Sequence, residues 1–240
     1  MDLKGLDALI LVGGLGTRLR SILPPDIPKP LAPIKGHPFL AYLLKFLAQQ
    51  GIERTVLATG FLSHVMEWAL EDIRPSGMKL ELSMEIEPLG TGGAIGHARH
   101  LLKSDPVLVL NGDSICPVAL GPMLLFHREK KALVTDLLTL MKDTGRFGSV
   151  QLDSLGRVTH FNEKLSDGSP GLINAGVYLF SKAALDHMPD LVPCSLECDI
   201  LPQWAGSDVF GFITKTPFLD IGTPESYGQA ENFFSRWFNE

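Results

Sequence analysis

The 240-residue chain has 45% hydrophobic and 20% charged residues and a formal net charge of −6. Such a composition supplies a sizeable core and excludes intrinsic disorder. The acidic balance offers no global positive field for a nucleic acid, and no apolar run approaches the roughly 20 residues that a membrane span needs. With three cysteines and no basic-then-apolar start, we expect a cytoplasmic protein with reduced thiols and neither a nucleic-acid nor a membrane partner.

The first half of the chain alternates short apolar runs with helical patterns. Ala8 to Val12 is a continuous apolar run followed at once by glycines, as in a strand buried on both faces. On the same grounds we predict strands at 8–12, 55–59, 79–84 and 107–110, and helices at 38–50, 62–73 and 94–102. Strands that alternate with helices of this length favour an α/β fold with a doubly wound, mainly parallel, Rossmann-like sheet.

Beyond about residue 133 the pattern becomes that of a mixed, more antiparallel sheet. We predict strands at 133–141, 149–152, 158–161 and 177–180, a hairpin turn at 153–156 and a helix at 223–238. Thr223 suits the N-cap of that helix and Pro224 its first position. Because no repeat or long linker divides the chain, we predict one domain over 1–240, with halves of about 1–132 and 133–240.

A glycine-rich loop, GGLGTR at 13–18, follows the first predicted strand. Glycines let backbone N–H groups approach phosphates closely, although a glycine cluster alone is as often only a tight turn. The loop is not a Walker loop, and Leu19 stands where the dinucleotide fingerprint needs a small residue. Two cations follow it, Arg18 and then Lys29, which is held between two prolines. Beside a glycine cradle, these cations are able to neutralise triphosphate oxygens.

The segments GGLGTRL at 13–19 and PKPLAP at 28–33 resemble the signature of the sugar-phosphate nucleotidyltransferases. The resemblance extends roughly from Ala8 to Tyr227. It implies the nucleotidyltransferase fold, in which the antiparallel portion binds the sugar phosphate. It also implies that the substrates are a nucleoside triphosphate (NTP) and a sugar 1-phosphate, and that Mg²⁺ is the cofactor.

A second glycine cluster, PLGTGGA at 88–94, is by itself no more than a good helix entry, but in the resembled family it lies against the nucleobase. Either Glu85 or Glu87 could accept a hydrogen bond from the base, and the residues do not decide between them. The resemblance implies catalytic roles for Arg18, Lys29 and Asp113. It implies nucleotide contacts for Val12, Gly13, Gly14, Gly16, Thr17, Arg18, Lys29, Glu87, Gly90, Thr91, Gly92, Gly112 and Asp113.

Two aspartates are candidates for a metal site. Asp113 follows a predicted parallel strand, where ligands bind in open α/β sheets, although a lone Asp there is more often a turn residue or helix cap. The resemblance implies that Asp113 and Asp220 both hold Mg²⁺, which two carboxylates, phosphate oxygens and water commonly bind. It further implies that the sugar 1-phosphate contacts Gly148, Glu163, Lys164, Asn174 and Gly176, in segments that are otherwise ordinary strands and turns.

The sequence shows no nucleophile paired with a general base. The histidines are scattered, and Cys194 and Cys198 have no matching Cys or His cluster, so a cysteine metal site is not expected. A sugar 1-phosphate has a second pKa near ~6 and is already anionic at neutral pH. Direct in-line attack on the α-phosphorus then needs positioning and charge neutralisation but no proton abstraction.

Within the family, the sequences at 88–95, 111–114 and 172–176 are most similar to those of guanylyltransferases that act on D-glycero-α-D-manno-heptose 1-phosphate. GTP and that heptose 1-phosphate are therefore the expected substrates. Mannose 1-phosphate guanylyltransferases and N-acetylmuramate 1-phosphate uridylyltransferases share much of the pattern. A metal-dependent glycosyltransferase ranks lower because Asn111 replaces the first residue of an Asp-x-Asp pair, and a non-catalytic regulatory relative ranks lower because the charged motif residues are retained. The oligomeric state, a homo-oligomer included, stays open.

Overall fold

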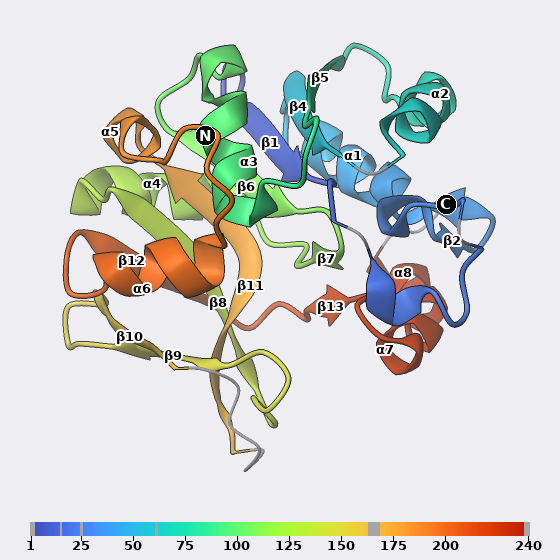
Figure 1. Ribbon diagram of the computed structural model, residues 1–240. Helices are drawn as coiled ribbons and strands as arrows, with labels where there is room; N and C mark the ends of the chain where they lie inside the picture. The colour runs from blue at the N-terminus through green and yellow to red at the C-terminus, as the bar shows by residue number, and fades with distance from the viewer. Residues whose placement is uncertain (1–2, 15, 25, 61, 163–168, 238–240) are drawn as a thin grey trace.

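The computed structural model describes residues 3–14, 16–24, 26–60, 62–162 and 169–237. A seven-stranded sheet runs through the molecule in the order β12-β8-β11-β6-β1-β4-β5 (Figure 1). Its strands are β1 (Asp7–Leu11), β4 (Arg54–Thr59), β5 (Lys79–Met84), β6 (Val107–Asn111), β8 (Val134–Met141), β11 (Gly171–Phe180) and β12 (Val209–Thr214). Because β11 pairs antiparallel with both neighbours and the other pairs are parallel, the sheet is mixed but mainly parallel, as predicted.

Helices cover both faces of this sheet. Successive strand residues alternate between two buried apolar clusters, as a sheet covered on both faces requires. One cluster contains residues of α1 (Phe39–Gln49), α2 (Ser63–Ile73), α4 (Leu120–Lys130) and α8 (Ala230–Trp237). The other contains residues of α3 (Gly90–Ala98), α5 (Lys182–Asp186) and α6 (Leu201–Trp204). The fold is therefore doubly wound.

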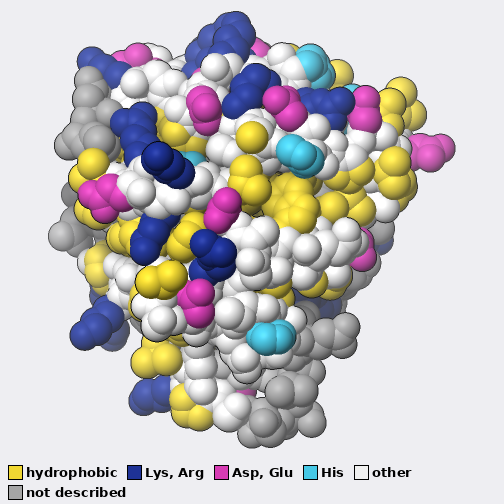
Figure 2. All heavy atoms as spheres, turned by 90° about the vertical axis from the view of Figure 1, so that its left-hand side faces the viewer, with side chains coloured by type: hydrophobic (Ala, Val, Ile, Leu, Met, Phe, Trp, Pro, Cys, Tyr) yellow, Lys and Arg dark blue, Asp and Glu magenta, His cyan; other side chains and the backbone are white. Residues whose placement is uncertain are grey.

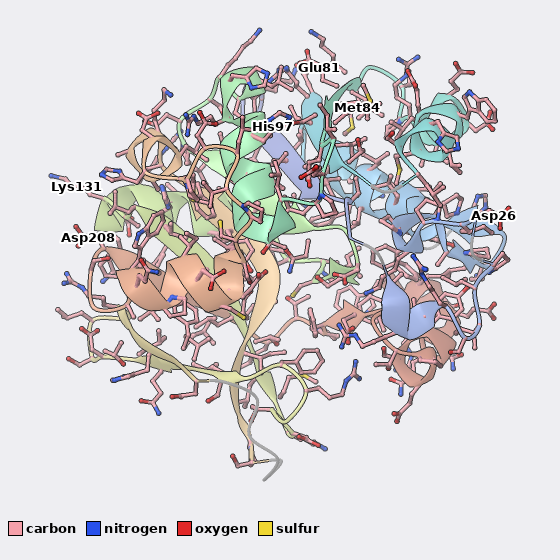
Figure 3. The ribbon with its side chains drawn as sticks, in the orientation of Figure 1. Asp26, Glu81, Met84, His97, Lys131 and Asp208 are labelled. Carbon is pink, nitrogen blue, oxygen red and sulfur yellow. The ribbon has the colours of Figure 1, made fainter. Side chains whose placement is uncertain are left out.

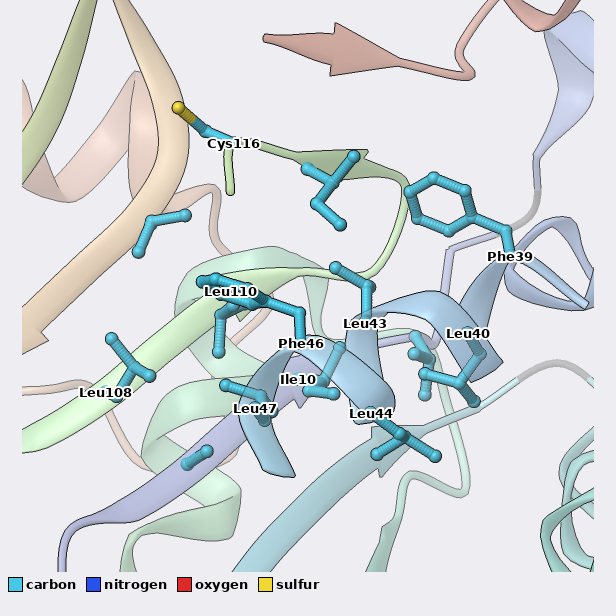
Figure 4. Packing of buried hydrophobic residues seen from close by; sticks show 14 of the residues in the cluster. Ile10, Phe39, Leu40, Leu43, Leu44, Phe46, Leu47, Leu108, Leu110 and Cys116 are labelled. Carbon is cyan, nitrogen blue, oxygen red and sulfur yellow. The ribbon is translucent and has the colours of Figure 1, made fainter. Parts of the chain in front are cut away.

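The leucine spacing that predicted the helix at 38–50 explains how α1 packs. Leu40, Leu43, Leu44 and Leu47 are fully buried and belong to the same apolar cluster as Ile10 of β1 (Figure 4). Leucines at positions i, i+3, i+4 and i+7 form one stripe of a helix, so one face of α1 lies on the sheet. This packing holds the carboxyl end of β1, and the glycine loop that follows it, in place.

Short antiparallel pairs surround the main sheet. They are β2 (Pro33–Ile34) with β3 (His37–Pro38), β7 (Ser114–Ile115) with β13 (Leu219–Asp220), and β9 (Ser149–Leu152) with β10 (Val158–Asn162). The predicted turn between β9 and β10 is confirmed: Asp153 Oδ1 accepts hydrogen bonds from the amides of Leu155 and Arg157, and Gly156 has a φ of +82°. Such a φ favours glycine.

Several predicted elements have different bounds in the structure. Helix α3 begins at Gly90, four residues before the predicted start, because glycines that read as a turn form its first part. The predicted helix at 223–238 is two helices, α7 (Pro224–Gly228) and α8, which part at Gln229. The Thr223 N-cap and Pro224 at the start of α7 are as predicted. The last predicted strand is longer, because β11 already begins at Gly171.

An ion-pair cluster lies at the amino ends of the parallel strands, away from their carboxyl ends. The strand register places Asp7 beside Arg54 and Arg54 beside Lys79. Arg54 contacts Asp7 Oδ2 through Nη1 at 2.8 Å and Glu81 Oε2 through Nη2 at 2.9 Å. Hydrogen bonds from Lys79 and then Arg54 lower the pKa of Glu81 to about 2. Glu81 is labelled at the top of β5 in Figure 3.

Among the helices that the structure describes, none is long and apolar enough to cross a bilayer. Figure 2 shows the molecule from the left-hand side of Figure 1. Lys and Arg side chains on this face are interspersed with acidic and hydrophobic ones instead of forming a continuous basic surface.

Candidate active site

A pocket of about 940 Å³ opens at the carboxyl ends of β1 and β6, beside the antiparallel strand β11. Parallel order is interrupted there, which is where open α/β sheets bind ligands. A smaller cavity of about 170 Å³ shares Gly14, Arg18, Gly112 and Asp113 with the pocket. Residues from both halves of the chain line the pocket.

The glycine loop forms one wall of these cavities. Gly13 and Gly14 line the pocket together with Arg18, and Val12 lines the smaller cavity. Thr17 begins a short helical turn, η1 (Thr17–Leu19), but its side chain lies outside the described part. The loop and its arginine therefore face the space in which the sequence predicts the triphosphate.

Lys29 joins the glycine loop to the first predicted metal carboxylate. It begins the turn η2 (Lys29–Leu31), and a Cβ on Gly16 would lie 2.9 Å from the Lys29 Cβ, so the loop packs directly on this residue. The Lys29 side chain is only 9% exposed, and its Nζ lies 2.5 Å from Asp113 Oδ2. Packing on both sides thus fixes a cation at the edge of the smaller cavity.

The two predicted metal carboxylates meet in the pocket although 107 positions separate them in the sequence (220 − 113). Strand β7 pairs antiparallel with β13, and the Ile221 amide donates to the Asp113 carbonyl oxygen at 2.8 Å. Asp220 Oδ2 accepts a hydrogen bond from Arg146 Nη2 at 2.8 Å, and its Oδ1 accepts one from the Gly222 amide. Each carboxylate is therefore paired with one cation. Among the described residues, no group of three or more His, Cys, Asp or Glu forms a metal site.

The second glycine cluster is only partly in the pocket. Gly90 and Thr91 line it, but Gly92 does not, since its Cα is buried against Cys194. A Cβ on Gly92 would lie 2.7 Å from Cys194 Sγ, and one on Gly93 would lie 2.6 Å from the Val192 carbonyl oxygen. The small residues thus admit a neighbouring segment of backbone, and this packing explains Gly92 better than the predicted nucleotide contact does.

Of the two glutamates that the sequence left open, the structure places Glu85 at the pocket. Its Oε2 accepts a hydrogen bond from the Leu89 amide at 2.9 Å, and its Oε1 lies close to Gly13. Burial raises the pKa of Glu85, and the hydrogen bond from Leu89 opposes that rise. Glu87 is exposed and is not among the residues that line the pocket.

The second half of the chain supplies the opposite wall, with Gly148, Asn174 and Gly176. Extra residues of β11 bulge out between Asn174 and Tyr178, as strands often do beside active sites. The bulge turns Asn174 so that its Nδ2 donates to Tyr178 Oη at 2.7 Å, while its Oδ1 accepts from the Gly176 amide at 2.7 Å. Gly176 has a φ of +69°, and a Cβ there would lie 2.7 Å from Ser114 Oγ. The predicted contacts Glu163 and Lys164 lie outside the described residues.

Several polar residues of the pocket are not among the contacts predicted from the sequence. Asn111, Arg146, Ser195 and Glu197 all line it. Ser195 and Glu197 belong to the start of a π-helical turn, η4 (Leu196–Ile200), which Ser195 caps by accepting from the Cys198 amide. A capping serine predicts a helix start, but no pattern in the sequence indicates that this turn faces the pocket.

Comparison with known proteins agrees with this geometry. The chain matches the Nucleotidyl transferase family over residues 7–236. It is 39% identical over 227 residues to the D-glycero-alpha-D-manno-heptose 1-phosphate guanylyltransferase of Aneurinibacillus thermoaerophilus, an alignment that covers 94% of this chain and 97% of that protein. It is 38% identical over 225 residues to the mannose-1-phosphate guanylyltransferase of Mycobacterium tuberculosis, and spans 62% of its length.

A solved structure is also similar over most of its length. The crystal structure of HddC from Yersinia pseudotuberculosis superposes with a TM-score of 0.86 at 34% identity, covering 95% of this chain and 99% of that one. HddC has also been crystallised in complex with GMP-PN. The chain therefore belongs to the nucleotidyl transferase family.

Proposed function

We propose that the protein transfers a guanylyl group from GTP to a manno-configured heptose 1-phosphate, giving GDP-heptose and pyrophosphate. The observation that carries the proposal is the single pocket in which the glycine loop, two cation-paired aspartates and the bulge of β11 face one another. A nucleotide and a phosphorylated sugar need those walls on opposite sides of the reacting phosphorus. The similarity to heptose 1-phosphate and mannose 1-phosphate guanylyltransferases supports the choice of substrates.

Enzymes of this family generally use a divalent metal ion, and the donor set of the pocket fits Mg²⁺. Asp113, in the turn between β6 and β7, and Asp220, in β13, offer carboxylate oxygens, and the Asp113 side chain is 40% exposed. Oxygen ligands from one or two carboxylates, completed by phosphates and water, are those Mg²⁺ prefers. When bound, the ion would neutralise triphosphate charge and hold the phosphates in line.

The reaction is one displacement at the α-phosphorus of GTP. A sugar-phosphate oxygen, held by Lys164, forms the new P–O bond while the bond to the β-phosphate oxygen breaks and pyrophosphate leaves. Arg18 and Lys29 stabilise the charge on the triphosphate and on the departing pyrophosphate. Lys29 and Arg146 are engaged with Asp113 and Asp220 in the present structure, so both cations exchange partners as the phosphates enter.

Glu85 is the residue of the base subsite that favours guanine. The guanine edge presents two adjacent donors, its N1–H and N2 amino groups, to which a carboxylate is complementary. The corresponding edges of adenine and cytosine place an acceptor beside a donor, and uracil offers one donor between two acceptors. Since leaving a partly buried carboxylate beside an acceptor is costly, we expect GTP to be preferred.

The test of this function is a pyrophosphate-release panel that crosses four NTPs with several sugar 1-phosphates at matched concentrations. We expect GTP with D-glycero-α-D-manno-heptose 1-phosphate to react fastest. Mannose 1-phosphate should remain a slower substrate, because the sugars differ only in one hydroxymethyl-type carbon. A clear preference for UTP with an N-acetylated amino sugar 1-phosphate would contradict the assigned substrates. No pyrophosphate release from any pair would favour the regulatory or glycosyltransferase alternatives.

Lys29 and Lys164 should have different kinetic roles, since they belong to segments matched to different substrates. We expect Lys29→Ala to impair chiefly the use of GTP, and Lys164→Ala chiefly the use of the sugar 1-phosphate. Losing one charge-assisted contact of about 1.5–3 kcal/mol corresponds to about 10- to 150-fold in kcat/KM. Initial rates with each substrate varied in turn give the two values. The same defect toward the same substrate in both variants would contradict two separate phosphate subsites.

A further inference from the structure

The Glu197 side chain lines the pocket at the place where the two halves of the site meet. The residue lies on the π-helical turn η4. Four donors from separate parts of the chain surround it. These are the hydroxyls of Thr91, Ser195 and Tyr178 and the side-chain amide of Asn111.

The two oxygens of Glu197 are bonded unequally. Oε2 accepts from Thr91 Oγ1 at 2.7 Å and from Ser195 Oγ at 3.1 Å. Oε1 has only two long contacts, with Asn111 Nδ2 at 3.5 Å and Tyr178 Oη at 3.4 Å. Hydrogen bonds to a carboxylate are normally about 2.5–2.9 Å long, so Oε1 retains the capacity to accept a closer donor. A hydroxyl that enters the pocket is such a donor.

The residues around each oxygen of Glu197 indicate which substrate could donate a hydrogen bond to Oε1. Oε2 is bound by Thr91, which belongs to the segment expected beside the nucleobase. Oε1 lies next to Tyr178, whose hydroxyl accepts from Asn174 Nδ2 at 2.7 Å. Asn174 belongs to the bulge of β11, in the half expected to hold the sugar. Asn111 of β6 also contacts Oε1, and Ser195 also contacts Oε2, so Glu197 lies where the two halves of the chain meet. Its less engaged oxygen, Oε1, is the one linked through Tyr178 to Asn174 of the half expected to hold the sugar.

A second acid, Asp136 of β8, differs from Glu197 in its surroundings. Asp136 is fully buried, and neither of its carboxylate oxygens has a hydrogen-bond partner within the described residues. Burial, and then the charge of Glu197, raise the pKa of Asp136 well above its usual range. Glu197, in contrast, lines the pocket and is surrounded by four donors, so it is the acid of the two that a substrate is able to reach.

We propose that Glu197 determines sugar specificity by accepting, through Oε1, a hydrogen bond from one hydroxyl of the sugar 1-phosphate. The inference rests on the proposed function, and names a residue that selects its second substrate. A carboxylate rejects an analogue that lacks the hydroxyl, because the loss leaves a partly desolvated charge without its donor. Sugars with that hydroxyl in another configuration are disfavoured for the same reason.

The experiment compares wild type, Glu197→Gln and Asp199→Asn. Asp199 lies in the same turn, and its Oδ2 accepts from the Ser195 amide at 2.7 Å, but it does not line the pocket, so its variant is the matched control. Each protein is assayed at saturating GTP with the best sugar 1-phosphate and with analogues that each lack one hydroxyl. We expect Glu197→Gln to lose about 10- to 100-fold in kcat/KM for the sugar, with the KM for GTP unchanged. Asp199→Asn should match wild type.

The decisive result is the pattern across the analogues. In Glu197→Gln the amide oxygen should take the Oε2 position, where the Thr91 and Ser195 hydroxyls donate, which leaves the NH2 group, a donor, at the Oε1 position. One analogue should therefore lose activity strongly with wild type but lose little more with Glu197→Gln, because the variant has no acceptor facing that hydroxyl. If, for every analogue, the loss caused by the substitution and the loss caused by the missing hydroxyl instead multiply, as independent effects do, Glu197 has only a structural role and the proposal is wrong. The same holds if Glu197→Gln raises the KM for GTP as much as the KM for the sugar 1-phosphate. Turnover by wild type separates this outcome from failure of the proposed function, which would appear as no pyrophosphate release from any sugar phosphate.

Discussion

Replacing Asp113 by asparagine should lower kcat/KM about a thousandfold, equivalent to about 4 kcal/mol of transition-state stabilisation, while leaving the fold intact. The variant keeps the size of the side chain but removes one of the two carboxylates that meet in the pocket. The backbone is spared, since the hydrogen bond from the Ile221 amide goes to the main-chain oxygen of Asp113. The loss should therefore lie in catalysis, measured as initial rates of pyrophosphate release over a range of Mg²⁺ concentrations.

A surface aspartate provides the control for this prediction. Asp208 pairs with Arg157 at 3.4 Å with its side chain 57% exposed, and it does not line the pocket, so Asp208→Asn changes the net charge equally without altering the site. We expect the control to retain wild-type rates and both variants to unfold at a similar temperature. Near-normal turnover by Asp113→Asn, or full wild-type activity in excess chelator, would contradict the proposed metal role.

Replacing Arg54 by methionine should lower the free energy of unfolding by about 3–5 kcal/mol, because it leaves a buried carboxylate without its cation. The Asp7 side chain is 6% exposed, and Arg54 is its partner at 2.8 Å. Asp7 Oδ2 also accepts from the Lys103 and Ser104 amides, which hold it in place but supply no full positive charge. Urea unfolding measures the loss, and the kinetic constants of the folded variant should stay unchanged, since the cluster lies at the opposite end of the strands from the pocket.

The effect of this substitution should depend on pH. The folded-state pKa of Glu81 is lowered from 4.5 to about 2, so its contribution to stability is complete above pH 4.5 and is lost as the pH falls toward 2. Because Arg54 provides part of that contribution, the difference between wild type and Arg54→Met should narrow over this range. Lys79→Met is the control, since the Lys79 side chain is 63% exposed and should cost about 1 kcal/mol or less. A loss in Arg54→Met no greater than in this control would contradict the role of the buried pair.

The sequence predicts strand bounds well both in the centre of the sheet and away from it. β5, at the sheet edge, and β9, outside the main sheet, have the predicted bounds. The central strands β1 and β6 differ from the predicted bounds by one residue, because their continuous apolar runs end close to glycine or asparagine. β12 escapes prediction since Gly211 interrupts its apolar pattern. A Cβ on Gly211 would lie 2.5 Å from Leu138 Cδ1, so glycine leaves room there for leucine side chains that pack across the sheet. Only the assembled sheet reveals that packing.

Some residues of the candidate site are predictable from local sequence motifs, and others are brought together only by the fold. The glycine loop, Lys29 and the aspartates are marked by motifs, and the structure places them around the pocket and the smaller cavity beside it. Glu197 is not marked, because its contact with Thr91 joins residues 106 positions apart and exists only after α3 and η4 have packed. The same is true of Glu85 and Glu87, since two residues of spacing do not decide which of them turns into the pocket.

The glycines that let α3 lie against residues 192–194 also make this helix dependent on its neighbour. Glycine disfavours a helix interior by about 1 kcal/mol relative to alanine, and four of the nine residues of α3 are glycine. A helix of this composition and length is not stable alone in water, so α3 depends on tertiary packing, which the sheet supplies on one side and the 192–194 backbone supplies at its glycines. Departure of that segment would unwind the start of α3, and with it the wall of the base subsite. Order in the nucleotide half is therefore maintained by a part of the chain that belongs to the sugar half.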